Sequence, residues 1–213
     1  MTEHRNRKAN DDQAHGADEP LALERIVFFS DAVIAIAITL LTFDLRLPNI
    51  SGAEDPALQQ ALGNLLPQYF AFFISFAVIA IYWIAHHRMF RYIVRWNSGL
   101  IVINFIFLFF VVQQPLLAQI LGLYGNLSTA AAIYAAGLAL MGFSSVFLWI
   151  YAVRAHLVSE DLSPSLVRYV GIRAAISATV FAVSVPIALF SAGLAQASWL
   201  LVLLISFAFR RRS

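Results

Sequence analysis

The sequence predicts an all-α, polytopic membrane protein with six transmembrane helices. Of its 213 residues, 61% are hydrophobic and only 12% are charged, whereas soluble domains are about half apolar and about a quarter charged. Six apolar stretches each approach the roughly 20 residues with which a helix crosses a bilayer core of about 30 Å. Basic residues concentrate on one side of these stretches. Lipid is therefore the main solvent of this chain.

The predicted helices follow one another with short connectors. Residues 1–24 are polar and of mixed charge, which predicts a disordered cytoplasmic tail without a cleavable signal sequence. The membrane domain covers residues 25–209, and residues 210–213 form a basic cytoplasmic C-terminus. Residues 191–193 are too few for anything but an antiparallel hairpin between the last two helices. The predicted spans are residues 26–43, 67–87, 100–120, 129–152, 170–190 and 193–209.

The distribution of basic residues predicts that both termini lie in the cytoplasm. With this orientation the inner segments hold 13 of the 14 Lys and Arg residues, and Arg46 alone lies outside. This is the positive-inside pattern of membrane proteins, and it explains the pI of about 9.2 without a nucleic-acid partner. The chain has no cysteine, which excludes disulfides, thiolate metal sites and a cysteine nucleophile.

The first apolar stretch separates a charged residue from an apolar stripe. Asp31 lies several residues inside the span, where a carboxylate is costly and should have a partner. At about 100° per residue, Asp31 is about 140° around the helix from Ile36. From periodicity alone, ordinary core packing is the favoured explanation of the stripe. The stripe consists of Ile36, Thr39, Leu40 and Phe43.

The end of the second helix offers partners for Asp31 at the same level of the membrane. His86 and His87 point about 100° apart on a helix, so they are poorly placed to bind one metal together. We expect one of them to face the bundle as a hydrogen-bond partner. The favoured role of the resulting network is structural. It comprises Arg25, Ser30 and Asp31 with Trp83 or Asn104.

The motif Arg25-x-x-x-Phe29-Ser30-Asp31, followed by Ala-Val-Ile-Ala-Ile-Ala-Ile-Thr-Leu-Leu, resembles the signature of a known family. This is the transmembrane protein 175 family of potassium channels, in its single-repeat prokaryotic form. The length and the six-helix topology also agree, and the resemblance is good over about residues 24–120. Two further segments resemble that family, namely Trp83-x-x-His86-His87-x-x-Phe90 and Asn104-Phe-x-Phe-Leu.

The resemblance implies a homotetramer with one central pore, lined by the first helix of each subunit and without a conventional filter loop. It implies that the pore narrows at Ile36, Leu40 and Phe43. Thr39 matches a threonine layer that favours potassium over sodium, so K⁺ is the expected permeant ion, with no cofactor and no fixed metal. The remaining motif residues would be structural in such a channel. These are Arg25, Phe29, Ser30, Asp31, Trp83, His86, His87 and Asn104.

The resemblance further implies an integral protein of a prokaryotic plasma membrane. Two features depart from the family pattern. Phe43 is bulkier than the usual leucine, which leaves its assignment as a constriction open. Gln113-Gln114-Pro115 is more polar than the third helix of relatives.

A proton-coupled transporter is the main alternative, because Asp31 with His86 or His87 could carry protons. Against it, residues 26–120 and 129–209 show no repeat beyond hydropathy, and paired broken helices are lacking. An enzyme would need a clustered nucleophile and base, or a metal motif such as HExxH, and the sequence contains neither. We therefore expect that the protein is not an enzyme.

Overall fold

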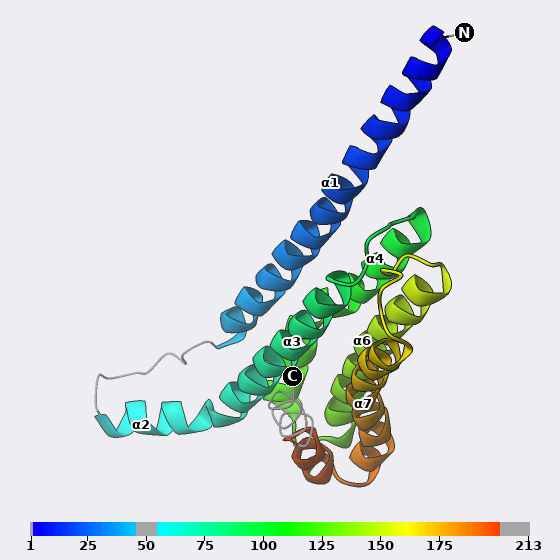
Figure 1. Cartoon of the computed structure of the whole chain (residues 1–213). Coiled ribbons are helices and arrows are strands. Elements are labelled where there is room, and N and C mark those ends of the chain that lie inside the picture. The colour runs from blue at the N-terminus through cyan, green and yellow to red at the C-terminus, as the bar shows by residue number, and fades with distance from the viewer. Residues whose placement is uncertain (1, 46–54, 201–213) are drawn as a thin grey trace.

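The computed structural model of the chain describes residues 2–45 and 55–200, and in this part every regular element is helical. The all-α class is thereby confirmed. Figure 1 shows α1 along one edge of the bundle and the pair α6 and α7 at the opposite edge. The elements in chain order are α1 (Thr2–Leu40), the short 3-10 helix η1 (Leu41–Asp44), α2 (Asp55–Asn64), α3 (Leu66–Phe90), α4 (Ser98–Val112), α5 (Gln114–Tyr124), α6 (Ser128–Arg154) and α7 (Pro164–Phe190).

Five segments of the described part are long and apolar enough to cross a membrane, which agrees with the first five predicted spans. The predicted sixth span, residues 193–209, lies partly outside the described residues. Residues 192–200 are helical, and the Trp199 indole donates a hydrogen bond to the Ser184 hydroxyl at 2.6 Å. This contact places the segment beside α7, as a hairpin requires. The five spans are Leu21–Phe43, Leu66–Phe90, Ser98–Tyr124, Ser128–Arg154 and Pro164–Phe190.

Two helical segments differ from the sequence-based expectation. Helix α1 begins at Thr2, so it includes most of residues 1–24, which we expected to lack regular structure. This segment contains several Ala, Glu, Arg and Lys residues, and such residues favour helix even where nothing apolar is buried. Helix α2 was not predicted, because its 10 residues are too few and too polar for a span. The division into tail, membrane domain and basic C-terminus stays a prediction, and residues 210–213 lie outside the described part.

The third span is interrupted between α4 and α5. Gln113 is a turn residue between the two helices, and Pro115 has no N–H group with which to continue the helical bonding to Val111. The side chain of Gln114 is completely buried, and its amide donates to the Phe110 carbonyl oxygen at 3.2 Å. The polar sequence Gln113-Gln114-Pro115 therefore marks a break inside the membrane.

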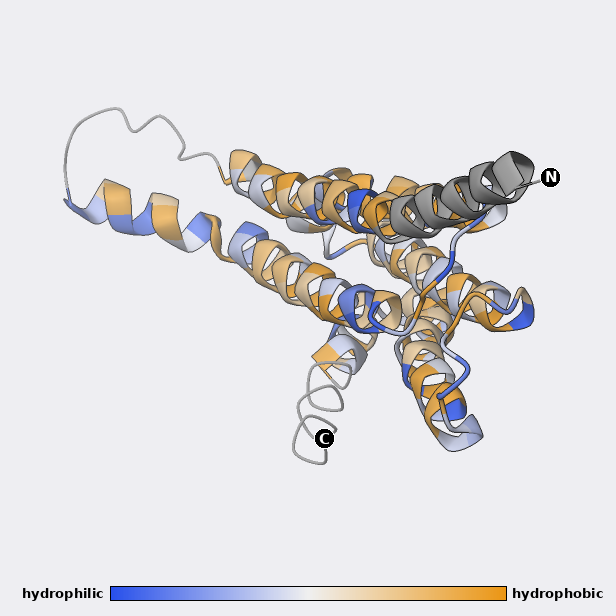
Figure 2. Cartoon of the chain, turned by 45° about the horizontal axis from the view of Figure 1, so that its top comes forward, coloured by the Kyte–Doolittle hydropathy of each residue, from blue (hydrophilic) through white to orange (hydrophobic). Residues whose placement is uncertain are grey.

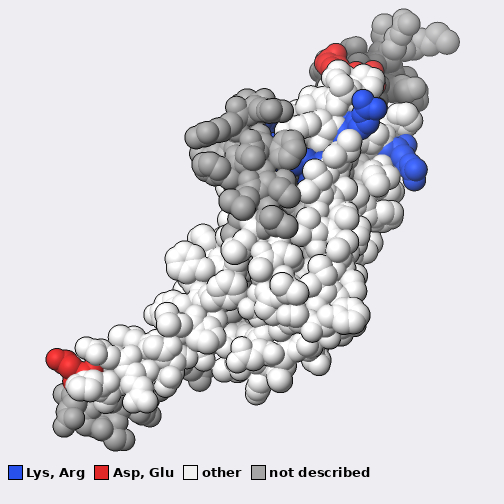
Figure 3. Space-filling view, turned by 90° about the horizontal axis from the view of Figure 1, so that it is seen from below, with Lys and Arg blue, Asp and Glu red and all other residues white. Residues whose placement is uncertain are grey.

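Basic and hydrophobic residues are separated along the length of the molecule. Figure 2 shows hydrophobic residues along the spanning helices and more hydrophilic ones near their ends. The Lys and Arg side chains visible in Figure 3 gather at one end of the molecule, whereas the middle of that face carries no charged side chain. At the basic end, Arg95 on the segment after α3 forms an ion pair with Glu160 at 2.7 Å. The protein is an integral membrane protein.

Helices α6 and α7 approach each other closely at Gly142. A Cβ atom added there would lie 2.8 Å from the Ala178 Cα atom and 2.5 Å from the Tyr82 hydroxyl oxygen. Small residues allow helix backbones to come together in membranes, where packing rather than water drives association. Gly142 therefore sets the spacing between α3, α6 and α7 at this level.

Gly142→Ala is expected to lower the free energy of unfolding by about 1–3 kcal/mol, because the added methyl group meets backbone that has no room to move. Gly63→Ala in α2 is the matched control, since a Cβ there would meet nothing within 4 Å. Thermal unfolding in detergent, followed by tryptophan fluorescence, compares the two variants. Equal unfolding temperatures would contradict the close packing at Gly142.

Candidate functional site

One face of α1 is buried against the rest of its own subunit. Ser30, Ile34, Ala37 and Leu41 are all buried. Their spacing of three or four residues corresponds to one face of a helix. This face packs on α3, α4 and α5, so the rotation of α1 about its axis is fixed relative to the subunit.

The predicted stripe lies on the opposite face of the same helix. The exposed fractions of Ile36, Leu40 and Phe43 are 59%, 40% and 70%, and Thr39 is also exposed. No part of the described subunit therefore covers the stripe, so core packing among the described residues, which periodicity favoured, does not account for it. Apolar side chains left uncovered at this depth contact lipid, another subunit or a pore.

A chain of hydrogen bonds fixes the buried face near the basic end of the molecule. The Ser30 hydroxyl donates to the Ile26 carbonyl oxygen at 2.8 Å, and it accepts from the Asn104 side-chain amide at 2.9 Å. The Asn104 side-chain oxygen lies 2.9 Å from His86 Nε2. All three polar side chains are buried. The chain thus joins α1, α4 and α3 where water is excluded.

The direction of this chain determines the tautomer of His86. Because the Asn104 amide nitrogen donates to Ser30, its oxygen is the acceptor, and the proton lies on His86 Nε2. The imidazole stacks on Phe107, with ring centroids 5.2 Å apart and planes 11° apart. The Phe90 ring also lies against the imidazole, with ring centroids 4.4 Å apart. His86 is therefore held as a hydrogen-bond donor between aromatic rings.

Asp31 belongs to a second, more accessible contact. Its carboxylate accepts a hydrogen bond from the Trp83 indole at 2.8 Å, which joins α1 to α3. His87 is exposed and lies beside Trp83, with ring centroids 5.7 Å apart. Among the described residues, no hydrogen bond joins Asp31 to His86 or His87. Trp83 and Asn104 therefore both donate hydrogen bonds to α1, Trp83 to Asp31 and Asn104 to Ser30.

The remaining motif residues have separate environments. Phe29 packs on Phe105 of α4, with ring centroids 5.5 Å apart. Arg25 is exposed, and it takes part in no hydrogen bond or ion pair of the described residues. The physical reason is its position, since five residues along a helix place it about 140° around from Ser30. The structure therefore does not bring Arg25 into the expected network.

The Thr39 side chain has a defined orientation within the stripe. Its hydroxyl donates to the Ile36 carbonyl oxygen at 2.8 Å, and Thr42 repeats this arrangement with the Thr39 carbonyl oxygen at 2.7 Å. A hydroxyl that donates its only hydrogen to the backbone keeps its lone pairs for other partners. Thr39 therefore presents an oxygen acceptor among exposed apolar side chains.

Comparison with known proteins places these features in a family. Residues 25–115 match a family model described as the endosomal/lysosomal potassium channel TMEM175. Over 179 residues the chain is 34% identical to a potassium channel of Streptomyces collinus, with 82% of this chain and 86% of that protein covered. The chain belongs to the TMEM175 family. The resemblance of its first-helix motif is thereby confirmed, and because this is a family of ion channels, the chain is not an enzyme.

The similarity to TMEM175 proteins extends to the fold. The structure has a TM-score of 0.78 and 28% identity to the crystal structure of a lysosomal potassium-selective channel TMEM175 homolog from Chamaesiphon minutus. That likeness covers 90% of this chain and 99% of the other. The endosomal/lysosomal proton channel TMEM175 of Bos taurus is 39% identical over 107 residues, but only 22% of that protein is covered. The match to the prokaryotic relatives thus extends over most of the chain.

Sequence reasoning missed the aromatic contacts that enclose the TMEM175 motif. Phe105 packs on Phe29, and Phe107 stacks on His86. Both residues belong to the Asn104-Phe-x-Phe segment, and the spacing of Asn104 and Phe107 by three residues already places them on one face of a helix. The identity of their partners depends on how α1, α3 and α4 meet, which the pattern of one helix does not specify.

Asn104→Leu is expected to reduce the free energy of unfolding by about 2 kcal/mol, because the His86 Nε2–H group then stays buried without an acceptor. Ser30→Ala should lower it by a similar amount, since it leaves the Asn104 side-chain N–H group buried without an acceptor. A double-mutant cycle of the two changes, measured by thermal unfolding in detergent, should be non-additive. Additive effects would contradict a continuous chain from Ser30 through Asn104 to His86.

Proposed function

We propose that the chain is a potassium-permeable cation channel whose pore is lined by the stripe of Ile36, Thr39, Leu40 and Phe43. The observation that carries this proposal is the opposite orientation of the two faces of α1. One face is held by the subunit core, and the other presents three large apolar side chains and a threonine that no part of the described subunit covers. Similarity to potassium channels over most of the chain supports the same function.

The pore requires several copies of the chain, because a single α1 cannot enclose an ion path. In a homotetramer around a central axis, Ile36 and Leu40 would form rings, with Phe43 nearer the outer end. An apolar ring resists ion entry because it offers a hydrated cation nothing in exchange for its water. Small outward movements of α1 would then be sufficient to open the path. Phe43 would narrow it further, as its exposed ring is the bulkiest of the three.

Thr39 would supply the polar level between the apolar rings. Since its hydroxyl hydrogen is used by the Ile36 carbonyl oxygen, the free lone pairs would face a passing cation. Oxygen ligands at a narrow level can replace part of the hydration shell of K⁺. No filter loop enters this account, because α5 and α6 are joined by residues 125–127 alone. K⁺ would be the permeant ion, without a cofactor or a fixed metal. The channel would lie in the plasma membrane of a prokaryote, with both termini in the cytoplasm.

Ile36→Asn is expected to raise potassium flux about fivefold or more, because an amide at the constriction lowers the cost of ion dehydration. Ile172→Asn is the matched control, since Ile172 lies on α7 with a similar exposed fraction of 54%. Potassium efflux from liposomes that contain the purified protein measures both variants. Equal flux in the two variants would place the constriction elsewhere. Saturable flux coupled to protons, unaffected by Ile36→Asn, would instead favour the transporter based on Asp31.

Thr39→Val is expected to reduce the preference for potassium over sodium about tenfold while flux persists, because it removes the oxygen ligands without changing the side-chain size. Thr42→Val removes an equivalent hydroxyl, bonded to the backbone in the same way one turn nearer the outer end, and should leave selectivity unchanged. Reversal potentials under bi-ionic potassium and sodium conditions give the ratio of potassium to sodium permeability. A loss of selectivity in both variants, or in neither, would contradict the assignment of Thr39.

A further inference from the structure

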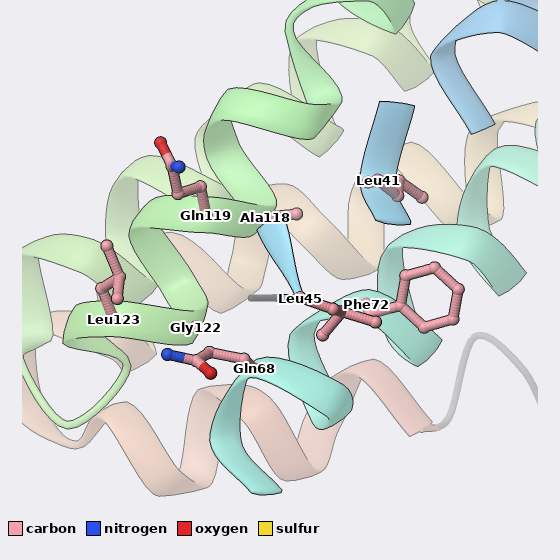
Figure 4. A pocket seen from close by; sticks show the side chains of 8 residues that line it. All are labelled: Leu41, Leu45, Gln68, Phe72, Ala118, Gln119, Gly122 and Leu123. Carbon is pink, nitrogen blue, oxygen red and sulfur yellow. The ribbon is translucent and has the colours of Figure 1, made fainter. Parts of the chain in front are cut away.

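A cavity of about 290 Å³ lies behind the end of α1, on the side that faces the subunit. Figure 4 shows it between η1, the start of α3 and the second half of α5. Leu41 lines it from η1 and Leu45 from the residue after η1, Phe72 lines it from α3, and Ala118 lines it from α5. Most of the wall is thus apolar. The cavity is separate from the hydrogen-bonded motif at the basic end of the molecule.

Gln68 provides an uncompensated polar group at this cavity. Its Oε1 atom is shielded from solvent and has no hydrogen-bond partner among the described residues. The close approach of α5 limits where this side chain can go, because a Cβ atom at Gly122 would lie 3.1 Å from the Gln68 Cα atom and 3.2 Å from its Cγ atom. A buried carbonyl oxygen without a donor is unfavourable by about 1–3 kcal/mol relative to a satisfied one. A ligand that supplies a donor would remove that cost once the amide turns its oxygen from the protein side, where it is shielded, toward the cavity.

We propose that this cavity is a binding site for a small amphiphile with one aromatic or aliphatic body and one hydroxyl group. A cavity of about 150 Å³ holds benzene, so the larger volume here suits one ring with a short alkyl chain. The apolar walls would take the body of the ligand. The hydroxyl would pair with the Gln68 amide, and because a hydroxyl both donates and accepts, it matches either orientation of that amide.

The position of the cavity gives its occupant a route to the pore, a consequence that rests on the proposed function. Leu41 is buried in the cavity wall, whereas the adjacent Leu40 is in the exposed stripe. A ligand behind Leu41 and Leu45 would oppose movement of η1 toward the subunit core. It would therefore hold the stripe in place and lower potassium flux. Binding itself does not depend on whether the stripe is a pore.

Binding is tested directly with 4-propylphenol, and with 4-propyltoluene as the probe of nearly the same shape that lacks the hydroxyl. Saturation-transfer NMR on the full-length protein in detergent gives both affinities. We expect 4-propylphenol to bind saturably and 4-propyltoluene to bind about tenfold more weakly. The Gln68→Leu variant should lose this difference between the probes. No saturable signal from 4-propylphenol with the unaltered protein would overturn the proposal, as would equal affinities for the two probes.

The location of the site is tested by filling it. Ala118→Leu should abolish binding of 4-propylphenol and leave the thermal unfolding temperature unchanged or raised, because the cavity accepts the new side chain. Ala139→Leu is the matched control, since both alanines are 6% exposed and Ala139 does not line the cavity. It should lower the unfolding temperature by overpacking. Unchanged binding in Ala118→Leu would place the probe elsewhere and refute the site, whatever the flux of either variant.

Discussion

The hydrogen-bonded chain from His86 through Asn104 to Ser30 is the constraint on which the arrangement of α1 depends. These side chains are buried at the level of the membrane, where an unpaired polar group has no water to replace its partner. Asn104 of α4 bonds Ser30 of α1 through its side-chain nitrogen and His86 of α3 through its oxygen, so α1 has one favourable rotation against α3 and α4. The apolar contacts of Ile34, Ala37 and Leu41 continue the same face toward the other end. These contacts add buried apolar area, but apolar contacts alone specify the rotation of a helix about its axis less strictly than hydrogen bonds do.

Once that rotation is fixed, the free face of α1 follows from helix geometry. A rotation of α1 that brought Ile36, Thr39 and Leu40 to the subunit core would break the hydrogen bond between Ser30 and Asn104. Asp31 has a different role from these side chains, because its carboxylate accepts a hydrogen bond from the Trp83 indole at the side of the helix. Structural polar residues and the proposed ion path therefore share one helix without sharing a face. The break at Gln113 interrupts the neighbouring third span, and the cavity behind Leu41 leaves η1 less tightly packed.

The sequence was sufficient for the features that depend on one helix at a time. Span lengths, the gathering of basic residues at one end and the separation of Asp31 from the Ile36 stripe follow from hydropathy and from the angle per residue. The family resemblance followed from the first-helix motif and two further segments. Features that depend on how helices meet were not accessible. The choice of His86 over His87, the exclusion of Arg25 from the network and the stacking of Phe107 all depend on the angles between helices. The polar α2 was missed because it has no span-length apolar pattern.

The central claim is that the uncovered face of α1 lines an ion path, and cysteine accessibility tests it most directly because the chain has no native cysteine. Single substitutions Ile36→Cys, Leu40→Cys and Ile34→Cys would be reconstituted and exposed to Ag⁺ during potassium flux. We expect rapid block at positions 36 and 40, protection from Ag⁺ by high potassium concentration, and no block at the buried position 34. Block at position 34 with none at positions 36 and 40 would contradict this claim, because the ion path would then lie inside the subunit and not along the stripe.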